Sequence, residues 1–346
     1  MRSLLTAVVT ASTLLTASAD AQPARSARDG ELIVALARPT PVREYAGWLL
    51  FSRWDGSAYH LSTWHEGVVR DLAVPPQEEP FEADVGPDSR GNPSAVVSRC
   101  RGSCDLYVIS LRPGARLRPV RNANTTGRDE VAPTVWKGRL AFGRRYGEDR
   151  VVPYTKLLAA PRSRPSDRLA GLPARRCGAI DPPDCRPIGD VRLAGMELWG
   201  RWVAQSWTYQ PDDFAGVRQN EIRLTDVART DTRQVAAMGT GIGGQTYLGP
   251  SIAKGRVAFF RACQGDPGGC THKNSGAIRY RISTGSYEIA GADEAWSSWA
   301  WSASAAYHVP SAYACTGGDP GATVEPCGII RTGRLPWRPL DPDRAR

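Results

Sequence analysis

A stretch that occurs twice constrains the fold of this chain more than any other feature. Val131–Arg144 reads V-A-P-T-V-W-K-G-R-L-A-F-G-R, and Leu248–Arg261 reads L-G-P-S-I-A-K-G-R-V-A-F-F-R. Each copy has a short apolar strand, a Lys-Gly turn, in which glycine adopts φ > 0 at little cost, and then an Arg-led apolar strand. A single copy predicts only a hairpin in an ordinary β-domain, whereas recurrence predicts stacked supersecondary units.

Looser copies of the second strand extend the pattern over most of the chain. The strands align on their last large residue, at Phe51, Val97, Phe142, Gln205, Phe259 and Ala306. The steps between these positions are 46, 45, 63, 54 and 47 residues, close to the length of a four-stranded propeller blade. Two further short strands follow each of them. The sequence therefore predicts an all-β fold, a six-bladed β-propeller of four-stranded antiparallel blades.

The strand expected at Glu31–Ala37 (E-L-I-V-A-L-A) is one more than the first blade needs, because Pro41–Tyr45 supplies the inner strand of that blade. Propellers avoid an open sheet edge when one terminus completes the blade at the opposite terminus. We expect this N-terminal strand to close the last blade by pairing near Leu335–Leu340, the expected outer strand of that blade.

Residues 129–144 resemble the repeat of the TolB-like (WD40-like) propeller family. That repeat runs from an acidic pair through Pro, a Trp-containing strand and a Gly turn into a strand ending Ala-Phe. The matching residues here are Asp129, Glu130, Pro133, Trp136, Gly138, Ala141 and Phe142. Asp105–Val108 (D-L-Y-V) is similar to another strand of the family, although the turn reads Lys-Gly where the family has Pro-Asp-Gly. The resemblance implies the fold and a leaning toward protein binding, not a defined activity.

The N-terminus has the pattern of a secretory signal peptide at residues 1–21. Arg2 precedes an apolar stretch, Leu4–Thr16, that is too short to span a bilayer, and we expect cleavage after Ala21. An uncleaved anchor is the alternative. Since no Cys follows the cleavage site, a lipid anchor is not expected. We expect residues 22–30 to be disordered, 31–340 to form the propeller and 341–346 to be a tail. The mature chain is expected to be a secreted, extracytoplasmic monomer without a membrane span.

The charge of the chain leaves two interpretations open. The net charge is +9, and 44 residues are Lys or Arg. The surface is either evenly basic and solvated, or it carries a patch for an anionic partner. Because no run of basic residues is dense enough, a nucleic-acid partner is not expected.

Eight cysteines in an exported chain predict disulfides. Proximity along the chain and the repeat select one pairing, namely Cys100–Cys104, Cys177–Cys185, Cys263–Cys270 and Cys315–Cys327. The alternative is a metal site at C-x3-C (Cys100, Cys104), but no His or second Cys pair lies nearby in the sequence. Each bridge closes a short loop and is expected to contribute only roughly 2–3 kcal/mol.

The positions of these pairs predict a binding face. Three pairs lie in loops between the second and third strands of a blade, and Cys177–Cys185 lies in a crossover between blades, so all four stiffen one face. The long loop expected at Trp207–Gln219 belongs to the same face. Rigid scaffolds that carry elaborate loops are typical binding surfaces, although stapling against proteolysis is an equally good explanation. The candidate binding residues on this face are Trp54, Trp207, Tyr209, Asp212, Asp213, Phe214, His272 and Lys273.

Recognisable catalytic motifs are absent from the sequence. There is no G-x-S-x-G, and the four histidines are scattered along the chain without a metal-binding spacing. We therefore assign no catalytic residue, no metal ligand and no cofactor. Paired carboxylates could serve glycoside hydrolysis, and Asp212-Asp213 is the best such cluster, but adjacent residues usually point apart.

The leading hypothesis is therefore a non-catalytic binding module for a protein or a cell-envelope polymer. The alternative is a propeller-type glycoside hydrolase or another carbohydrate-active enzyme, and a third possibility is a passive structural component. Asp, Glu and Arg side chains converging on the central channel would favour the enzyme. A channel without such a cluster would count against it.

Overall fold

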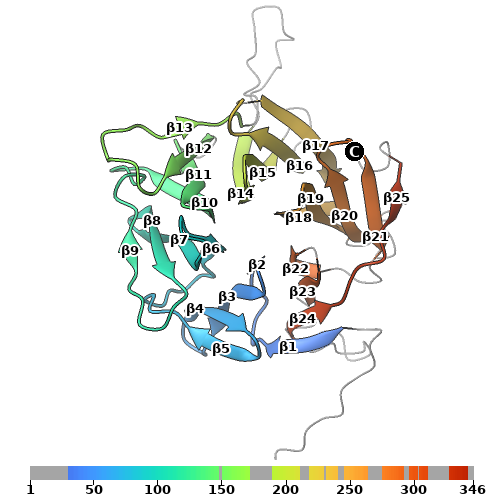
Figure 1. Cartoon of the computed structure of the whole chain (residues 1–346), viewed down its shortest axis with the longest axis horizontal. Coiled ribbons are helices and arrows are strands. Elements are labelled where there is room, and N and C mark those ends of the chain that lie inside the picture. The colour runs from blue at the N-terminus through green and yellow to red at the C-terminus, as the bar shows by residue number, and fades with distance from the viewer. Residues whose placement is uncertain are drawn as a thin grey trace, which may run out of the picture.

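The blades of a propeller are visible in the computed structural model (Figure 1). The structure describes residues 30–147, 150–171, 189–210, 218–229, 231–240, 245–263, 275–291, 296–302, 304–310 and 327–341. Within these ranges the chain forms strands and no helix. Six antiparallel sheets stand in a ring around a common centre, as the repeat predicts.

The first three blades each consist of four consecutive strands in sequence order. Blade 1 contains β2 (Val42–Tyr45), β3 (Trp48–Trp54), β4 (Tyr59–His65) and β5 (Val68–Asp71). Blade 2 contains β6 (Glu82–Pro87), β7 (Pro93–Arg101), β8 (Ser103–Ser110) and β9 (Arg118–Pro119). Blade 3 contains β10 (Asp129–Trp136), β11 (Arg139–Arg145), β12 (Val151–Leu157) and β13 (Asp167–Arg168).

The last three blades include the two termini of the described chain. Blade 4 contains β14 (Gly189–Trp199), β15 (Trp202–Gln210), β16 (Arg218–Asp226) and β17 (Asp231–Thr240). Blade 5 contains β18 (Gln245–Ala253), β19 (Arg256–Cys263), β20 (Gly276–Arg281), β21 (Tyr287–Gly291) and, added at its edge, β25 (Arg338–Leu340). Blade 6 contains β22 (Trp296–Trp301), β23 (Ala306–Pro310), β24 (Gly328–Thr332) and β1 (Glu31–Ala35).

The N-terminal strand closes the last blade, as predicted, but its predicted partner is wrong. β1 pairs antiparallel with β24, with Glu31 opposite Arg331, and so occupies the outer edge of blade 6 itself. The segment expected at that edge, Leu335–Leu340, instead contributes β25, which pairs with β21 of blade 5. The reason is that a strand edge accepts one neighbour, and β1 already covers β24. Leu335 is buried in the apolar cluster between blades 5 and 6, which directs the C-terminal segment along blade 5.

The core is divided into apolar layers between neighbouring blades. Buried residues form six clusters, and each joins residues of two adjacent blades. The second strand of a blade is buried on both faces, and Leu49, Leu50 and Phe51 of β3 are each at most 2% exposed. This double burial is the reason why the second strands are continuous apolar runs in the sequence rather than alternating ones.

Side chains also join the inner strands of neighbouring blades. The Oγ of Ser298 in blade 6 accepts a hydrogen bond from the N–H of Val42 in blade 1, at 2.9 Å. The Oγ1 of Thr134 accepts one from the N–H of Leu198 at 2.9 Å, between blades 3 and 4. These bonds satisfy backbone donors on inner strands that have a sheet partner on one side only.

Gly86→Ala is expected to lower the free energy of unfolding by roughly 1–3 kcal/mol, because it overpacks the contact between blades 2 and 3. A Cβ at Gly86 would lie 2.0 Å from the carbonyl oxygen of Val135, which is backbone and cannot rotate away. The matched control is Gly291→Ala in β21, where a Cβ would meet nothing within 4 Å. Urea unfolding of both variants tests this, and equal stability of the two would show that the close approach carries no energy.

Candidate functional site

An arginine lies across the centre of the ring. Arg43 belongs to β2 of blade 1, yet its guanidinium approaches blades 4 and 5 on the opposite side. A Cβ added to Gly249 would lie 3.0 Å from Nη1, and one added to Gly195 would lie 3.3 Å from Nη2. Glycine at these two inner-strand positions therefore leaves the space that the guanidinium occupies.

Three carboxyl groups from inner strands belong to the same cluster. Asp84 of β6 and Glu197 of β14 feel the charge of Arg43, and Glu44 of β2 lies close enough to affect Glu197. Burial raises the pKa of Glu44 to about 7 and that of Asp84 to about 6, with Arg43 opposing the shift at Asp84. The pKa of Glu197 is raised well above its ordinary value, first by burial and then by the negative charge of Asp84; Arg43 opposes this shift too. At neutral pH the cluster therefore holds protons that ordinary carboxyl groups would release.

Two of the three carboxyl groups have a structural role. The Oδ2 of Asp84 accepts a hydrogen bond from the N–H of Val135 at 3.3 Å, and so joins blade 2 to blade 3. The Oε1 of Glu44 accepts one from the N–H of Gly47 at 2.9 Å, which closes the β2–β3 turn. Asp84 is 2% exposed, and its Oδ1 is buried without a hydrogen-bond partner among the described residues.

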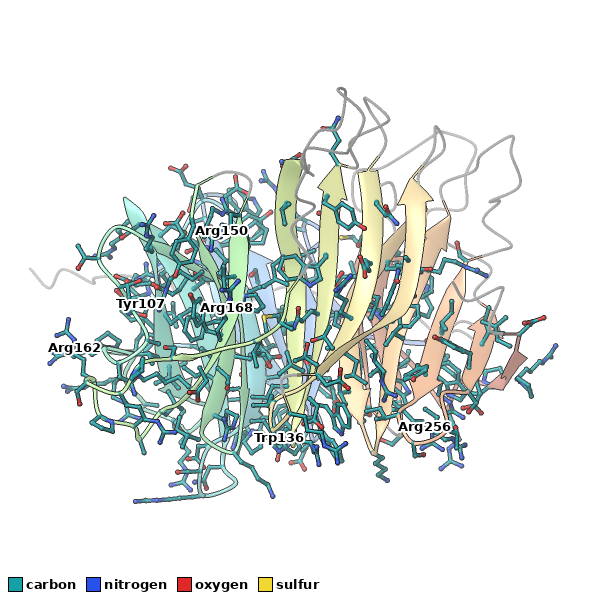
Figure 2. The ribbon with its side chains drawn as sticks, turned by 90° about the horizontal axis from the view of Figure 1, so that it is seen from above. Tyr107, Trp136, Arg150, Arg162, Arg168 and Arg256 are labelled. Atoms are coloured by element: carbon teal, nitrogen blue, oxygen red, sulfur yellow. A yellow bond between two sulfur atoms is a disulfide. The ribbon has the colours of Figure 1, made fainter. Side chains whose placement is uncertain are left out.

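Aromatic rings gather where three inner strands end. Tyr45, Trp136 and Trp199 are the last residues of β2, β10 and β14. The ring centroids of Tyr45 and Trp136 are 5.8 Å apart, and those of Trp136 and Trp199 are 5.7 Å apart. Figure 2 places Trp136 at the edge of the propeller where Arg256 also lies, which is the face of the short β-turns. The aromatic contacts link blades 1, 3 and 4 on this side of the charged cluster.

The cluster of Asp, Glu and Arg side chains in the central channel, which would favour an enzyme, is therefore present in part. Asp, Glu and Arg side chains do meet in the channel, but an acid/base pair needs two carboxyl groups that face a substrate. Asp84 and Glu44 are hydrogen-bonded to backbone, which leaves Glu197 as the carboxyl group with no such role among the described residues. No sequence motif indicated this cluster. Its one local signal was the charged pair Arg43-Glu44 within an expected inner strand.

The predicted disulfide Cys100–Cys104 is confirmed. The two residues are directly opposite each other in the β7–β8 hairpin, and their sulfur atoms are 2.02 Å apart. This is a disulfide and not the alternative metal site. Cys327 is also disulfide-bonded. Cys263 ends β19, and the remaining predicted partners lie outside the described residues: Cys177, Cys185, Cys270 and Cys315.

The predicted role of Trp207 is wrong. It lies inside β15, which continues to Gln210, and its side chain is fully buried. Its Nε1 donates a hydrogen bond to Oε1 of Gln205 at 2.9 Å. The ring packs in the cluster between blades 3 and 4, so it offers no face to a ligand. The predicted loop therefore begins too early in the sequence, because β15 continues beyond Trp207 to Gln210.

Two further candidate residues are held by neighbours. Trp54 is half-buried at the end of β3, with the guanidinium of Arg38 3.8 Å from its ring centroid. The hydroxyl of Tyr209 donates a hydrogen bond to Oε2 of Glu221 at 3.1 Å, and burial raises the pKa of this tyrosine. Five predicted binding residues lie outside the described residues: Asp212, Asp213, Phe214, His272 and Lys273.

Within the residues that the structure describes, no group of three or more His, Cys, Asp or Glu side chains could hold a metal ion. Among the same residues, no helix is long and apolar enough to cross a membrane.

Comparisons with known proteins concern the fold. No family model and no curated protein match the sequence. The chain is similar in structure to TolB from Acinetobacter baumannii, with 13% identity and a TM-score of 0.48 over 85% of this chain and 66% of that one. It is also similar to the S511A mutant of puromycin hydrolase complexed with PGG, with 16% identity and a TM-score of 0.48 over 91% and 55% of the two chains.

A chain of the nidogen/laminin complex is a third similar structure, with 8% identity and a TM-score of 0.48 over 77% of this chain and 86% of that one. This chain thus spans about two thirds of the TolB chain and about half of the puromycin hydrolase chain. At such identities the likeness is one of fold alone. The chain is a six-bladed β-propeller, the fold implied by its sequence resemblance to the TolB-like repeat.

Proposed function

We propose that this chain is an exported, non-catalytic binding module that presents one face of its propeller to a protein or a cell-envelope polymer. On this proposal the chain is cleaved after Ala21 and acts as a monomer. The observation that carries the proposal is the length of the connections between the second and third strands of blades 4, 5 and 6.

Two-residue turns join the first and second strands of several blades on one face. Ala46-Gly47 joins β2 to β3, Lys137-Gly138 joins β10 to β11, and Lys254-Gly255 joins β18 to β19. At the other face, longer segments separate the second and third strands of blades 4, 5 and 6: 211–217 between β15 and β16, 264–275 between β19 and β20, and 311–327 between β23 and β24. Long connections on a rigid scaffold are where binding residues are concentrated in folded proteins. The disulfide Cys100–Cys104 lies in a hairpin of this long-loop face.

The proposal is tested by capture of a partner with the full mature chain immobilised. In the loop variant, residues 211–217 are replaced by Asn-Gly, which can join β15 to β16 because Tyr209 already pairs with Gln219. The control carries Lys137→Ser in the β10–β11 turn of the opposite face. We expect one saturable partner from envelope or secreted extract to bind the wild type and the control, and binding to fall at least about tenfold in the loop variant. Equal binding by all three proteins would refute the long-loop face as the site.

A second function, glycoside hydrolysis, is favoured by the carboxyl groups with raised pKa values in the channel. A general acid needs such a pKa, and Glu197 is the group free of a backbone role among those described. This alternative predicts release of reducing sugar from envelope polysaccharide and its loss in Glu197→Gln. The binding module predicts no release by either protein.

A further inference from the structure

A cavity of about 480 Å³ lies between blades 4 and 5 on the short-turn face. Its lining includes Trp202 at the start of β15, Lys254 in the β18–β19 turn, Arg256 at the start of β19 and Arg281 at the end of β20. Figure 2 places Arg256 at this edge of the molecule. Three cationic side chains and an indole thus share one hollow.

Two of these arginines are directly opposite each other on neighbouring strands. Arg256 and Arg281 are partners in the register of β19 and β20. Like charges in this position repel each other across a distance of a few ångströms. Neither is fully exposed, and the Nε of each is buried with no acceptor among the described residues. Within the described part of the protein, the two guanidinium groups therefore have N–H donors without acceptors and an uncompensated positive charge.

A third guanidinium lies behind the wall of the cavity. Nη2 of Arg233 donates a hydrogen bond to the carbonyl oxygen of Ile282 at 2.9 Å. The guanidinium lies 5.5 Å from the ring centroid of Trp202 and 5.1 Å from that of Tyr280, so aromatic rings hold it in place. Its Nε is likewise buried without an acceptor among the described residues.

A carboxylate near the cavity, that of Glu288, does not neutralise Arg256 and Arg281. Glu288 lies close enough to Arg256 and Arg281 to respond to their charge. However, its two oxygens accept hydrogen bonds from Arg279, at 2.6 and 2.8 Å. Arg279 therefore balances Glu288, and the cavity keeps a positive charge.

We propose that this cavity binds a phosphate or sulfate monoester, with the tetrahedral oxyanion between Arg256 and Arg281 and the organic part against Trp202. A guanidinium donates two parallel hydrogen bonds to an oxyanion. A tetrahedral oxyanion directs its three terminal oxygens to different sides, which suits two guanidinium groups that approach from different strands better than the two coplanar oxygens of a carboxylate. The indole gives an apolar face for the ester group. This site is on the face opposite the proposed loop site and does not depend on it.

The test is calorimetric titration of the full mature chain at low salt with phenyl phosphate, phenyl sulfate, inorganic phosphate and benzoate. We expect phenyl phosphate or phenyl sulfate to bind at one site, at least about tenfold more tightly than benzoate. Comparison of the two esters distinguishes the phosphate source from the sulfate source. Arg256→Gln and Arg281→Gln are each expected to weaken this binding at least about tenfold, since each removes a charge-assisted contact.

The control is Arg118→Gln, which removes the same charge from an exposed position in β9 of blade 2. It should leave the affinity unchanged, whereas equal weakening by Arg118→Gln would mean that general charge attracts the anion and would overturn the proposal. Trp202→Leu should reduce the affinity for phenyl phosphate to that for inorganic phosphate. It should leave the affinity for inorganic phosphate unchanged.

The melting temperature distinguishes a binding role of Arg256 and Arg281 from a structural role. Because Arg256 and Arg281 repel each other, Arg256→Gln should keep or raise the melting temperature in anion-free buffer. Arg281→Lys retains the charge but loses the Nε donor, and it should still bind the ester more weakly. Unchanged affinity in Arg256→Gln or Arg281→Gln, or the absence of binding by any of the four probes to the wild type, would refute the site.

Discussion

Arg144→Met is expected to lower the free energy of unfolding by about 3–5 kcal/mol at neutral pH, because it leaves a buried carboxylate without its partner. The side chain of Glu130 is 0% exposed, and Nε of Arg144 donates to its Oε1 at 2.9 Å. The hydroxyl of Thr125 donates to the same oxygen at 2.7 Å. Nη2 of Arg144 also donates to the carbonyl oxygen of Ala123 at 2.7 Å, so the substitution removes two contacts of blade 3 at once.

The decrease in the free energy of unfolding of Arg144→Met is expected to depend on pH. Burial raises the pKa of Glu130 above its ordinary value even beside Arg144. A carboxyl group with a raised folded-state pKa binds its proton more tightly in the folded than in the unfolded protein. Stability from this group is therefore greatest below the unfolded-state pKa and is lost as pH rises through the folded-state pKa. Without Arg144 the folded-state pKa rises further, so the deficit of Arg144→Met should be large at pH 7.5 and smaller near pH 5.

Urea unfolding at the two pH values measures this effect. The control is Arg53→Met, which breaks an exposed ion pair with Asp71 whose side chains are 37% and 40% exposed. Exposed pairs contribute about 0–1 kcal/mol, so the control should change little. The double variant Glu130→Gln with Arg144→Met should recover part of the stability because no charge remains buried. Equal losses in Arg144→Met and Arg53→Met would contradict this account.

Val34→Asp is expected to destabilise the protein by roughly 4 kcal/mol or more, since it buries an unpaired charge in the strand that closes the ring. Val34 lies in β1, is 6% exposed, and packs in the cluster between blades 6 and 1. β1 covers the outer edge of β24, so its release would expose both this cluster and an unpaired strand edge.

Hydrogen exchange and urea unfolding test the role of β1. In Val34→Asp, backbone amides of β24 should lose protection before those of blade 3. The matched control is Val68→Asp in β5, because this valine is also in the outer strand of a blade but is 57% exposed. The control should cost less than about 1 kcal/mol, as surface substitutions usually do. A similar loss in both variants would mean that β1 is not needed to hold the ring closed.

The repeat determined the architecture because it is a local signal. Each apolar second strand next to a turn specifies one hairpin, and six such strands specify six blades. The same reasoning located the inner strand at Pro41–Tyr45, the closing strand at the N-terminus and the disulfide Cys100–Cys104, whose partners are four residues apart. In each case the partners lie close in sequence, or the constraint is a free edge that any propeller must cover.

Only the tertiary structure decided the contacts between residues that closure of the ring brings together. Arg43 meets Gly195 and Gly249 because blades 1, 4 and 5 face each other across the centre. Trp207 is buried because β15 extends further than its repeat predicts, and β25 joins blade 5 because β1 has taken its expected place. The cationic cavity likewise needs Trp202 of blade 4 beside Arg256 of blade 5. Sequence patterns of strands and turns report local conformation, whereas these contacts depend on how many blades there are and which edge each end of the chain covers.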